Sequence, residues 1–129
     1  GEVRGSEAVD MITAFNTGHD GSMSTGHANS ARDMLSRLEN MILMGMDIPL
    51  AAVKQQIASA IDIMIHLGRI RDKSRRVLEI TEIDGIQDGE IKMHTLYEFT
   101  EDASPRIGIL QKKGQLQHVE KLKAAGLML

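Results

Sequence analysis

The chain has 129 residues, of which 42% are hydrophobic and 26% are charged, and its formal net charge is −3. This length allows one compact core, and the composition excludes the disordered and fibrous classes of protein. With two Phe, one Tyr, no Trp and no long basic block, the sequence argues against a nucleic-acid partner. It contains no cysteine, which excludes disulfides and thiolate metal sites, and no apolar run approaches the roughly 18 residues of a membrane-spanning helix.

The first half of the chain carries the apolar periodicity of helices. Residues 6–17 place apolar side chains at helical spacing, and Gly18 is expected to end this helix in the left-handed conformation. Residues 21–28 are small enough for one short strand. Ser30 and Asp33 have the spacing of a capping box, which predicts a helix that begins after Ser30 and carries its apolar positions between Met34 and Gly45. After the corner at Gly45 and Pro49, a second helix is expected over residues 50–61.

The second half reads as strands followed by one helix. The β-branched residues 61–67 predict a buried strand, residues 77–83 predict another, and Asp88-Gly89 predicts a hairpin turn into residues 90–97. Residues 100–105 are polar, and a closing amphipathic helix is expected around the apolar positions Leu116, Val119, Leu122 and Leu127. Several methionines are interpreted as core filler: Met34, Met41, Met44, Met46 and Met64. The fold class expected is therefore α/β, with helices packed on a small sheet whose C-terminal strands are antiparallel.

Two clusters of polar and small residues carry the functional signal. The first is Gly-Glu-Val-Arg-Gly at residues 1–5, which lacks an initiator Met and reads like the exit of a strand, so the chain is expected to begin within a domain. The second is Thr-Gly-His-Asp-Gly-Ser-Met-Ser-Thr-Gly-His-Ala-Asn-Ser at residues 17–30. Their order and spacing resemble the type II/type IV secretion ATPases, and most closely the tight-adherence (Flp) pilus and conjugation-type branch. In that family "GE-x-R" closes the Walker B strand, and "TGH…T-x-HAN" forms the His box.

The resemblance covers residues 1–99 with high specificity and the final helix more loosely. It implies that residues 1–99 are the C-terminal portion of a RecA-like P-loop ATPase domain, and that residues 100–129 are a linker and an amphipathic helix. A P-loop of the form Gly-x-x-x-x-Gly-Lys-Ser/Thr is absent from the 129 residues. The chain alone is therefore expected to be inactive, whereas the resemblance implies ATP and Mg²⁺ as cofactors of a parent protein.

The family mechanism assigns roles to individual residues of this sequence. Glu2 matches the Walker B glutamate, which orients the attacking water for phosphoryl transfer; a solvated acidic residue near a terminus is an equal alternative. His27, with His19 beside it, matches the His-box residue that senses the terminal phosphate; a pair of surface histidines is the alternative. Arg4 and Arg37 match positions suited to subunit or phosphate contacts, and ordinary surface ion pairs explain them at least as well.

Three functional hypotheses follow from these residues. The first is the family's own: a hexameric ring at the cytoplasmic face of the inner membrane, working with inner-membrane platform proteins, that couples ATP hydrolysis to secretion or pilus assembly. The second is a non-catalytic interaction module of a secretion machine. The third, a metal hydrolase built on His19, Asp20 and His27, ranks low because their spacing matches no common metal motif. The basic run at residues 69–76 is interpreted as a solvated turn rather than a contact with lipid or a platform protein.

Overall fold

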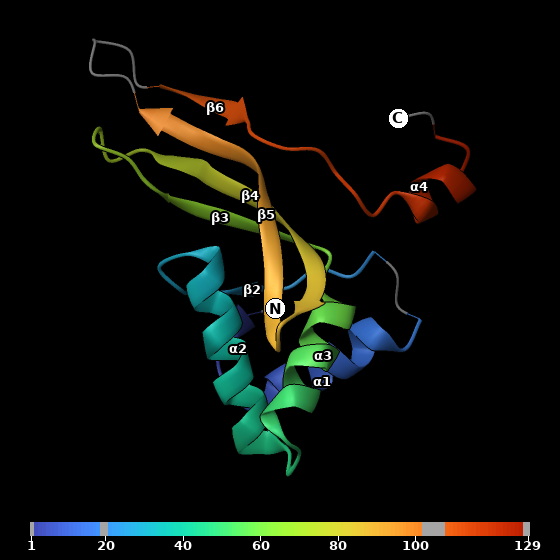
Figure 1. The fold of residues 1–129 in the computed structure, drawn as a ribbon. Coiled ribbons are helices and arrows are strands. Elements are labelled where there is room, and N and C mark those ends of the chain that lie inside the picture. Colours follow the sequence, from blue (N-terminus) through green and yellow to red (C-terminus); the bar gives the residue numbers. More distant parts are fainter. Residues whose placement is uncertain (1, 19–20, 102–107, 128–129) are drawn as a thin grey trace.

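The computed structural model describes residues 2–18, 21–101 and 108–127. Three helices, α1 (Glu7–Asn16), α2 (Ala31–Gly45) and α3 (Leu50–Ala60), lie around one end of a long hairpin formed by β4 (Arg75–Gln87) and β5 (Glu90–Glu101) (Figure 1). The other end carries β6 (Gly108–Lys112), and β3 (Ile63–Arg69) flanks β4. The described chain ends in the short helix α4 (Glu120–Ala124), and the two-residue strands β1 (Glu2–Val3) and β2 (Thr25–Gly26) form a separate small sheet.

The expected helix boundaries are confirmed and have local causes. Gly18 follows α1 with φ of 82°, a left-handed conformation that favours glycine. At the start of α2 the Ser30 hydroxyl accepts a hydrogen bond of 3.0 Å from the Asp33 N–H. The Asp33 carboxylate in turn accepts a bond of 3.4 Å from the N–H of Asn29 rather than from that of Ser30. The predicted cap is therefore present, with its reciprocal bond displaced by one residue.

One apolar core joins the three helices to the sheet. Helix α3 contacts α1, α2, β4 and β5, so it lies between the other helices and the strands. The fully buried side chains come from α1 through α3 and from the β4–β5 hairpin; they include Ile12, Ile42, Val53, Ile57 and Ile91. Burying this apolar surface is the main stabilising term for such a domain.

The four-stranded sheet is antiparallel throughout, in the order β3-β4-β5-β6. The predicted turn between β4 and β5 is confirmed: Asp88 and Gly89 have φ of 54° and 78°, as the tight turn of a two-residue hairpin requires. Two contacts hold this turn against the helices. Arg32 of α2 donates a bond of 2.9 Å to the carbonyl of Ile91, and the buried Lys54 of α3 donates one of 2.6 Å to Glu90.

Lys54 is the centre of a small charge cluster. Its Nζ lies 2.6 Å from Glu90 Oε2 and 3.7 Å from Glu39 Oε1 of α2. The hydrogen bond with Glu90 raises the pKa of Lys54 and lowers the pKa of Glu90, because each charge favours the ionised form of the other. Through these ion pairs Lys54 links α3 both to α2 and to the hairpin.

The structure corrects several sequence-based expectations. Strand β3 is not buried: Ile63, Ile65 and Leu67 on one of its faces are 38%, 56% and 60% exposed. The reason is that β3 is an outer strand of the described sheet, and the described helices pack against the other face. Met44 is 80% exposed, so it is not core filler.

The C-terminal region also differs from expectation. Residues 108–112 form β6, which pairs with β5, whereas the sequence suggested no strand there. Helix α4 has five residues, fewer than the apolar periodicity predicted, and Leu116 precedes it in an extended segment. The division of the chain at residue 99 stays a prediction, although the β5–β6 pairing connects the two sides of it.

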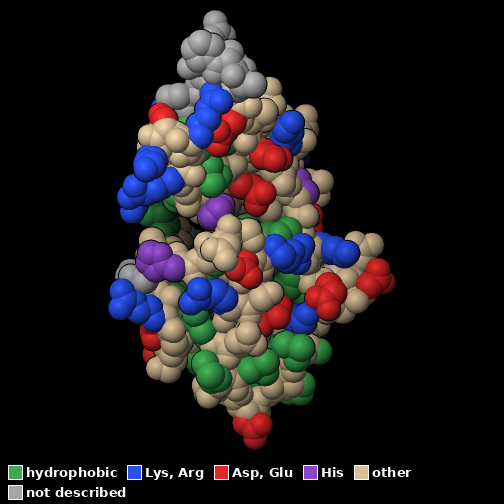
Figure 2. Space-filling model, turned by 90° about the vertical axis from the view of Figure 1, so that its left-hand side faces the viewer, with side chains coloured by type: hydrophobic (Ala, Val, Ile, Leu, Met, Phe, Trp, Pro, Cys, Tyr) green, Lys and Arg blue, Asp and Glu red, His purple; other side chains and the backbone are tan. Residues whose placement is uncertain are grey.

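The surface carries mixed charge. Figure 2 views the side of the molecule that bears the β3–β4 turn and shows Lys and Arg interspersed with Asp and Glu. Within the basic run at residues 69–76, Asp72 accepts bonds from the backbone and hydroxyl of Ser74, and Arg71 lies 3.6 Å from Glu101. This arrangement agrees with a solvated turn. Among the described residues no helix combines the length and apolarity needed to cross a bilayer.

Candidate functional site

The two motifs singled out from the sequence lie side by side in the small parallel sheet. Glu2 is paired with Thr25 and Val3 with Gly26, although α1 and a loop separate them along the chain. Because both strands run in the same direction, they end at the same edge, and Arg4 and His27 are the residues that follow them. The carboxyl ends of parallel strands are where α/β proteins place their ligands.

Close packing fixes this small sheet on the helices. Val3 is buried, and it belongs to the same core as Ala8 and Leu35. A side chain at Gly26 would place its Cβ 2.8 Å from Cε and 3.1 Å from Sδ of Met34 in α2. The Met34 side chain therefore packs directly on the backbone of Gly26, and a larger residue there would require Met34 to move.

The five predicted site residues are not equally well placed by the structure. The backbone of Glu2 lies in β1. His27 is exposed immediately after β2, Arg4 is exposed after β1, and Arg37 is exposed on α2. His19 lies outside the described residues, as does Asp20 of the metal hypothesis. The structure thus brings together β1, which contains Glu2, and β2, which His27 follows, and the roles assigned to all five residues stay predictions.

The carboxylate of Glu7 stabilises the backbone turn between β1 and α1. Glu7, in the first turn of α1, accepts hydrogen bonds from the backbone N–H groups of Arg4 and Gly5. These bonds, that of Arg4 first, lower the pKa of Glu7 because they favour the charged carboxylate. This contact sets the path of the chain between β1 and α1.

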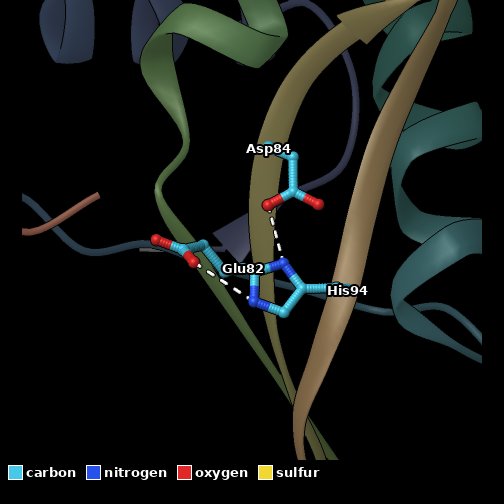
Figure 3. A group of neighbouring side chains, drawn as sticks. All are labelled: Glu82, Asp84 and His94. Carbon is cyan, nitrogen blue, oxygen red and sulfur yellow. Dashed lines mark hydrogen bonds and ion pairs between the residues drawn. The ribbon is translucent and has the colours of Figure 1, made fainter. Parts of the chain in front are cut away.

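A second group of ionisable residues, not singled out from the sequence, lies on the β4–β5 hairpin. Glu82 and Asp84 of β4 face His94 of β5 (Figure 3). His94 Nδ1 is 2.6 Å from Asp84 Oδ1, and Nε2 is 3.4 Å from Glu82 Oε1. Glu82 is only 2% exposed.

Strand irregularity explains how both carboxylates reach one ring. Glu82 is the direct partner of His94 across the ladder, whereas the register shifts between Ile83 and Gly85 and leaves Asp84 as an extra residue. Such a bulge re-aims the side chain of the residue that it contains. Gly85 follows with φ of 126°, a conformation open to glycine. Strand β4 also carries Glu79 and Thr81, so the sequence pattern alone did not single out Glu82.

The same group holds the segment that leads to α4. We refer to residues 113–127 as the C-terminal arm. Glu82 accepts bonds of 2.8 Å and 3.0 Å from the backbone N–H groups of Gln117 and His118, and His94 Nε2 lies 2.9 Å from the carbonyl oxygen of Gln115. The buried carboxylate therefore has partners for both of its oxygens, as a buried charge requires.

These three side chains could be considered as metal ligands, since one donor atom of each lies within 4.8 Å of the others. The geometry does not favour this use. An ion binds one nitrogen of an imidazole, but Asp84 approaches Nδ1 and Glu82 approaches Nε2. Both oxygens of Glu82 also accept backbone hydrogen bonds. The described arrangement is that of a hydrogen-bonded cluster.

A hollow of about 540 Å³ lies beside this cluster. Its walls come from the end of α3, the start of β3, β4 and the C-terminal arm, and include Glu82, Asp84, Ile83, Leu116 and Leu122. Arg4, His27 and Arg37, three of the residues predicted for the nucleotide site, are not among the described residues that line it. The hollow and the β1–β2 edge are therefore different parts of the molecule.

Comparison with known proteins identifies the family. The family model described as "Type II/IV secretion system protein" matches residues 1–122. The chain belongs to this family. A candidate conjugal transfer protein of Mycobacterium tuberculosis is 41% identical over 80 residues, which are 62% of this chain and 22% of that protein. The conjugal transfer protein TrbB of Rhizobium radiobacter is 31% identical over 103 residues, 80% of this chain and 31% of that protein.

A solved structure supports the same assignment. The VirB11 ATPase of the Brucella suis type IV secretion system, crystallised with sulphate, matches with a TM-score of 0.57 and 29% identity over 62% of this chain and 25% of that one. This confirms the expected fold class, an α/β part of a RecA-like ATPase domain with antiparallel C-terminal strands. The chain spans less than a third of the length of each of these relatives.

Proposed function

We propose that this chain supplies one edge of the nucleotide site of a secretion ATPase, the edge that contains the Walker B glutamate and the His box. The observation that carries this proposal is the parallel pairing of β1 with β2, which sets the Glu2 motif beside the His27 motif. Family membership over residues 1–122 supports it independently.

In this proposal each residue has a distinct task. Glu2 orients the water that attacks the terminal phosphate, either directly or through Mg²⁺. His27, assisted by His19, donates a hydrogen bond to phosphate oxygen and responds to loss of that phosphate. Arg4 and Arg37 contact phosphate or a neighbouring subunit.

The proposal extends to the parent protein. It forms a hexameric ring that binds ATP and Mg²⁺, lies at the cytoplasmic face of the inner membrane, contacts platform proteins there and drives secretion or pilus assembly. The resemblance to type IV secretion ATPases supports this reading. The 129 residues include no P-loop sequence, so the isolated chain is proposed to hydrolyse no ATP.

A second proposal is that the chain acts as a non-catalytic interaction module of the secretion machine, a role that family membership over residues 1–122 also allows. The two proposals differ in what the reading frame encodes upstream of Gly1, which translation of the source DNA decides.

The test measures phosphate release by the 129-residue chain and by the longest polypeptide that the same reading frame encodes. We expect release from the longer protein only, and a fall of about 100-fold or more in kcat for Glu2→Gln. The His27→Ala variant is expected to lose activity while it still binds ATP, and Glu98→Gln, an exposed residue of β5, is the control. A longer protein with unchanged activity after Glu2→Gln would refute the assignment. The absence of a longer frame would favour the interaction module.

A further inference from the structure

The environment of His94 is unusual because both ring nitrogens face atoms that only accept hydrogen bonds. Nδ1 is 2.6 Å from a carboxylate oxygen of Asp84, and Nε2 is 2.9 Å from the carbonyl oxygen of Gln115. A neutral imidazole has a single N–H and can donate to one of them, whereas the imidazolium donates to both. The geometry therefore requires the charged ring, provided that the carboxylate of Asp84 is ionised.

The charges around the ring favour the same state. The two carboxylates that face it are Glu82 and Asp84, both on β4, and the C-terminal arm presents the Gln115 carbonyl to it. His118 and Lys121 of the arm line the adjacent hollow. The pKa of His94 is raised above its ordinary value of 6.5, chiefly by the bond to Gln115 and then by the two carboxylates, while burial acts in the opposite direction.

We propose that protonation of His94 fastens the C-terminal arm to the sheet, so that the arm is a proton-controlled strap over the hollow beside β4. The arm is attached at its start and at the His94 cluster. The N–H groups of Lys113 and Gly114 donate to the carbonyl of Leu96 where β6 ends. Beyond these, Gln115, Gln117 and His118 are all held by the His94–Glu82 pair.

Loss of the proton weakens this attachment in two ways. One of the two acceptors, Asp84 or Gln115, loses its donor, and the buried Glu82 loses the positive charge that lies 3.4 Å away. A buried charge whose partner is removed is strongly destabilising, so Glu82 gains by exposure to water. Because Leu116 and Leu122 of the arm form one wall of the hollow, release of the arm opens the hollow on that side.

The direction of the pH dependence follows from the raised pKa. A group whose pKa is higher in the attached state contributes its full stabilisation below its ordinary pKa, about 6.5. That contribution is lost as the pH rises through the raised value. The arm is thus fastened in mildly acidic solution and loosens on alkalinisation. This inference is independent of the proposed nucleotide site.

Nuclear magnetic resonance of the full 129-residue chain tests the proposal directly. At pH 6 the ¹⁵N spectrum of the His94 ring is expected to show both nitrogens protonated. As the pH rises, the amide resonances of Gln117 and His118 should shift with the same midpoint as the ring. A neutral ring at pH 6, or a proton on Asp84 in place of the ring, would overturn the proposal. Amide resonances of Gln117 and His118 that do not shift as His94 titrates would also overturn it.

Three variants distinguish the effect of the His94 proton from an effect on folding. His94→Gln should abolish the shared titration of the arm amides, whereas His66→Gln, on β3, should leave it unchanged. In Gly114→Ala the new Cβ would lie 2.7 Å from the backbone oxygen of Thr95 and 3.3 Å from the His94 ring, so the arm should detach at every pH. Its release should return the midpoint of His94 toward 6.5. If Gly114→Ala detaches the arm and leaves this midpoint unchanged, the arm and the proton are not coupled and the proposal is wrong.

Discussion

Truncation of Ile57 is the sharpest test of how the helices and the sheet are joined. Ile57 is 0% exposed and lies on α3, which contacts α1, α2 and the β4–β5 hairpin. Ile57→Ala removes three buried carbon groups at about 0.8 kcal/mol each, or about 2.4 kcal/mol, and the cavity left behind raises the cost to about 3–4 kcal/mol. For a chain of this length that corresponds to a fall of about 10–15 °C in Tm.

The assay is thermal unfolding followed by circular dichroism, with Leu50→Ala as the matched control on the same helix. Leu50 is 45% exposed, so its truncation should cost less than about 1 kcal/mol. The better helix propensity of alanine opposes the loss in both variants by a few tenths of a kcal/mol. If the two variants melt within about 3 °C of each other, α3 does not occupy the centre of the core and the packing described above is wrong.

Three further predictions concern the surface and the element ends. Lys54→Met removes the partner that lowers the pKa of Glu90. A carboxylate whose pKa is lowered in the folded state contributes stability that is lost on acidification. The urea midpoint of unfolding should therefore fall more steeply between about pH 5 and pH 3 in the native chain than in the variant. An equal fall of the urea midpoint in both proteins would contradict this. Ser30→Ala removes the cap of α2 and should cost about 1 kcal/mol in urea unfolding, whereas the exposed Ser36→Ala should not destabilise. The exposed apolar face of the outer strand β3 is expected to make the native chain self-associate, and Ile65→Lys should reduce that association, with light scattering as the measurement. A native chain that is monomeric at high concentration would refute this expectation.

For the candidate nucleotide site, the sequence supplied the identity of the residues and the structure supplied their proximity. The order of the motifs around Glu2 and His27 was enough to indicate the family, because motif order is a property of the chain itself. The pairing of β1 with β2 could not be predicted from local pattern, since each strand has only two residues and no period to detect. Their meeting depends on how α1 and α2 pack beneath them.

Patterns between neighbours along the chain were sufficient to predict three helices with 3.6-residue periodicity, the cap at Ser30 and the turn at Asp88. Their signals lie within about four residues and need no tertiary context. The exposure of one face of β3 could not be predicted in this way, because burial of a β-branched strand depends on what covers it. The meeting of Glu82 and Asp84 with His94 could not be predicted either. Their contact depends on the β4–β5 register and on the bulge after Ile83, and a register displaced by one residue would have turned these side chains to opposite faces of the sheet.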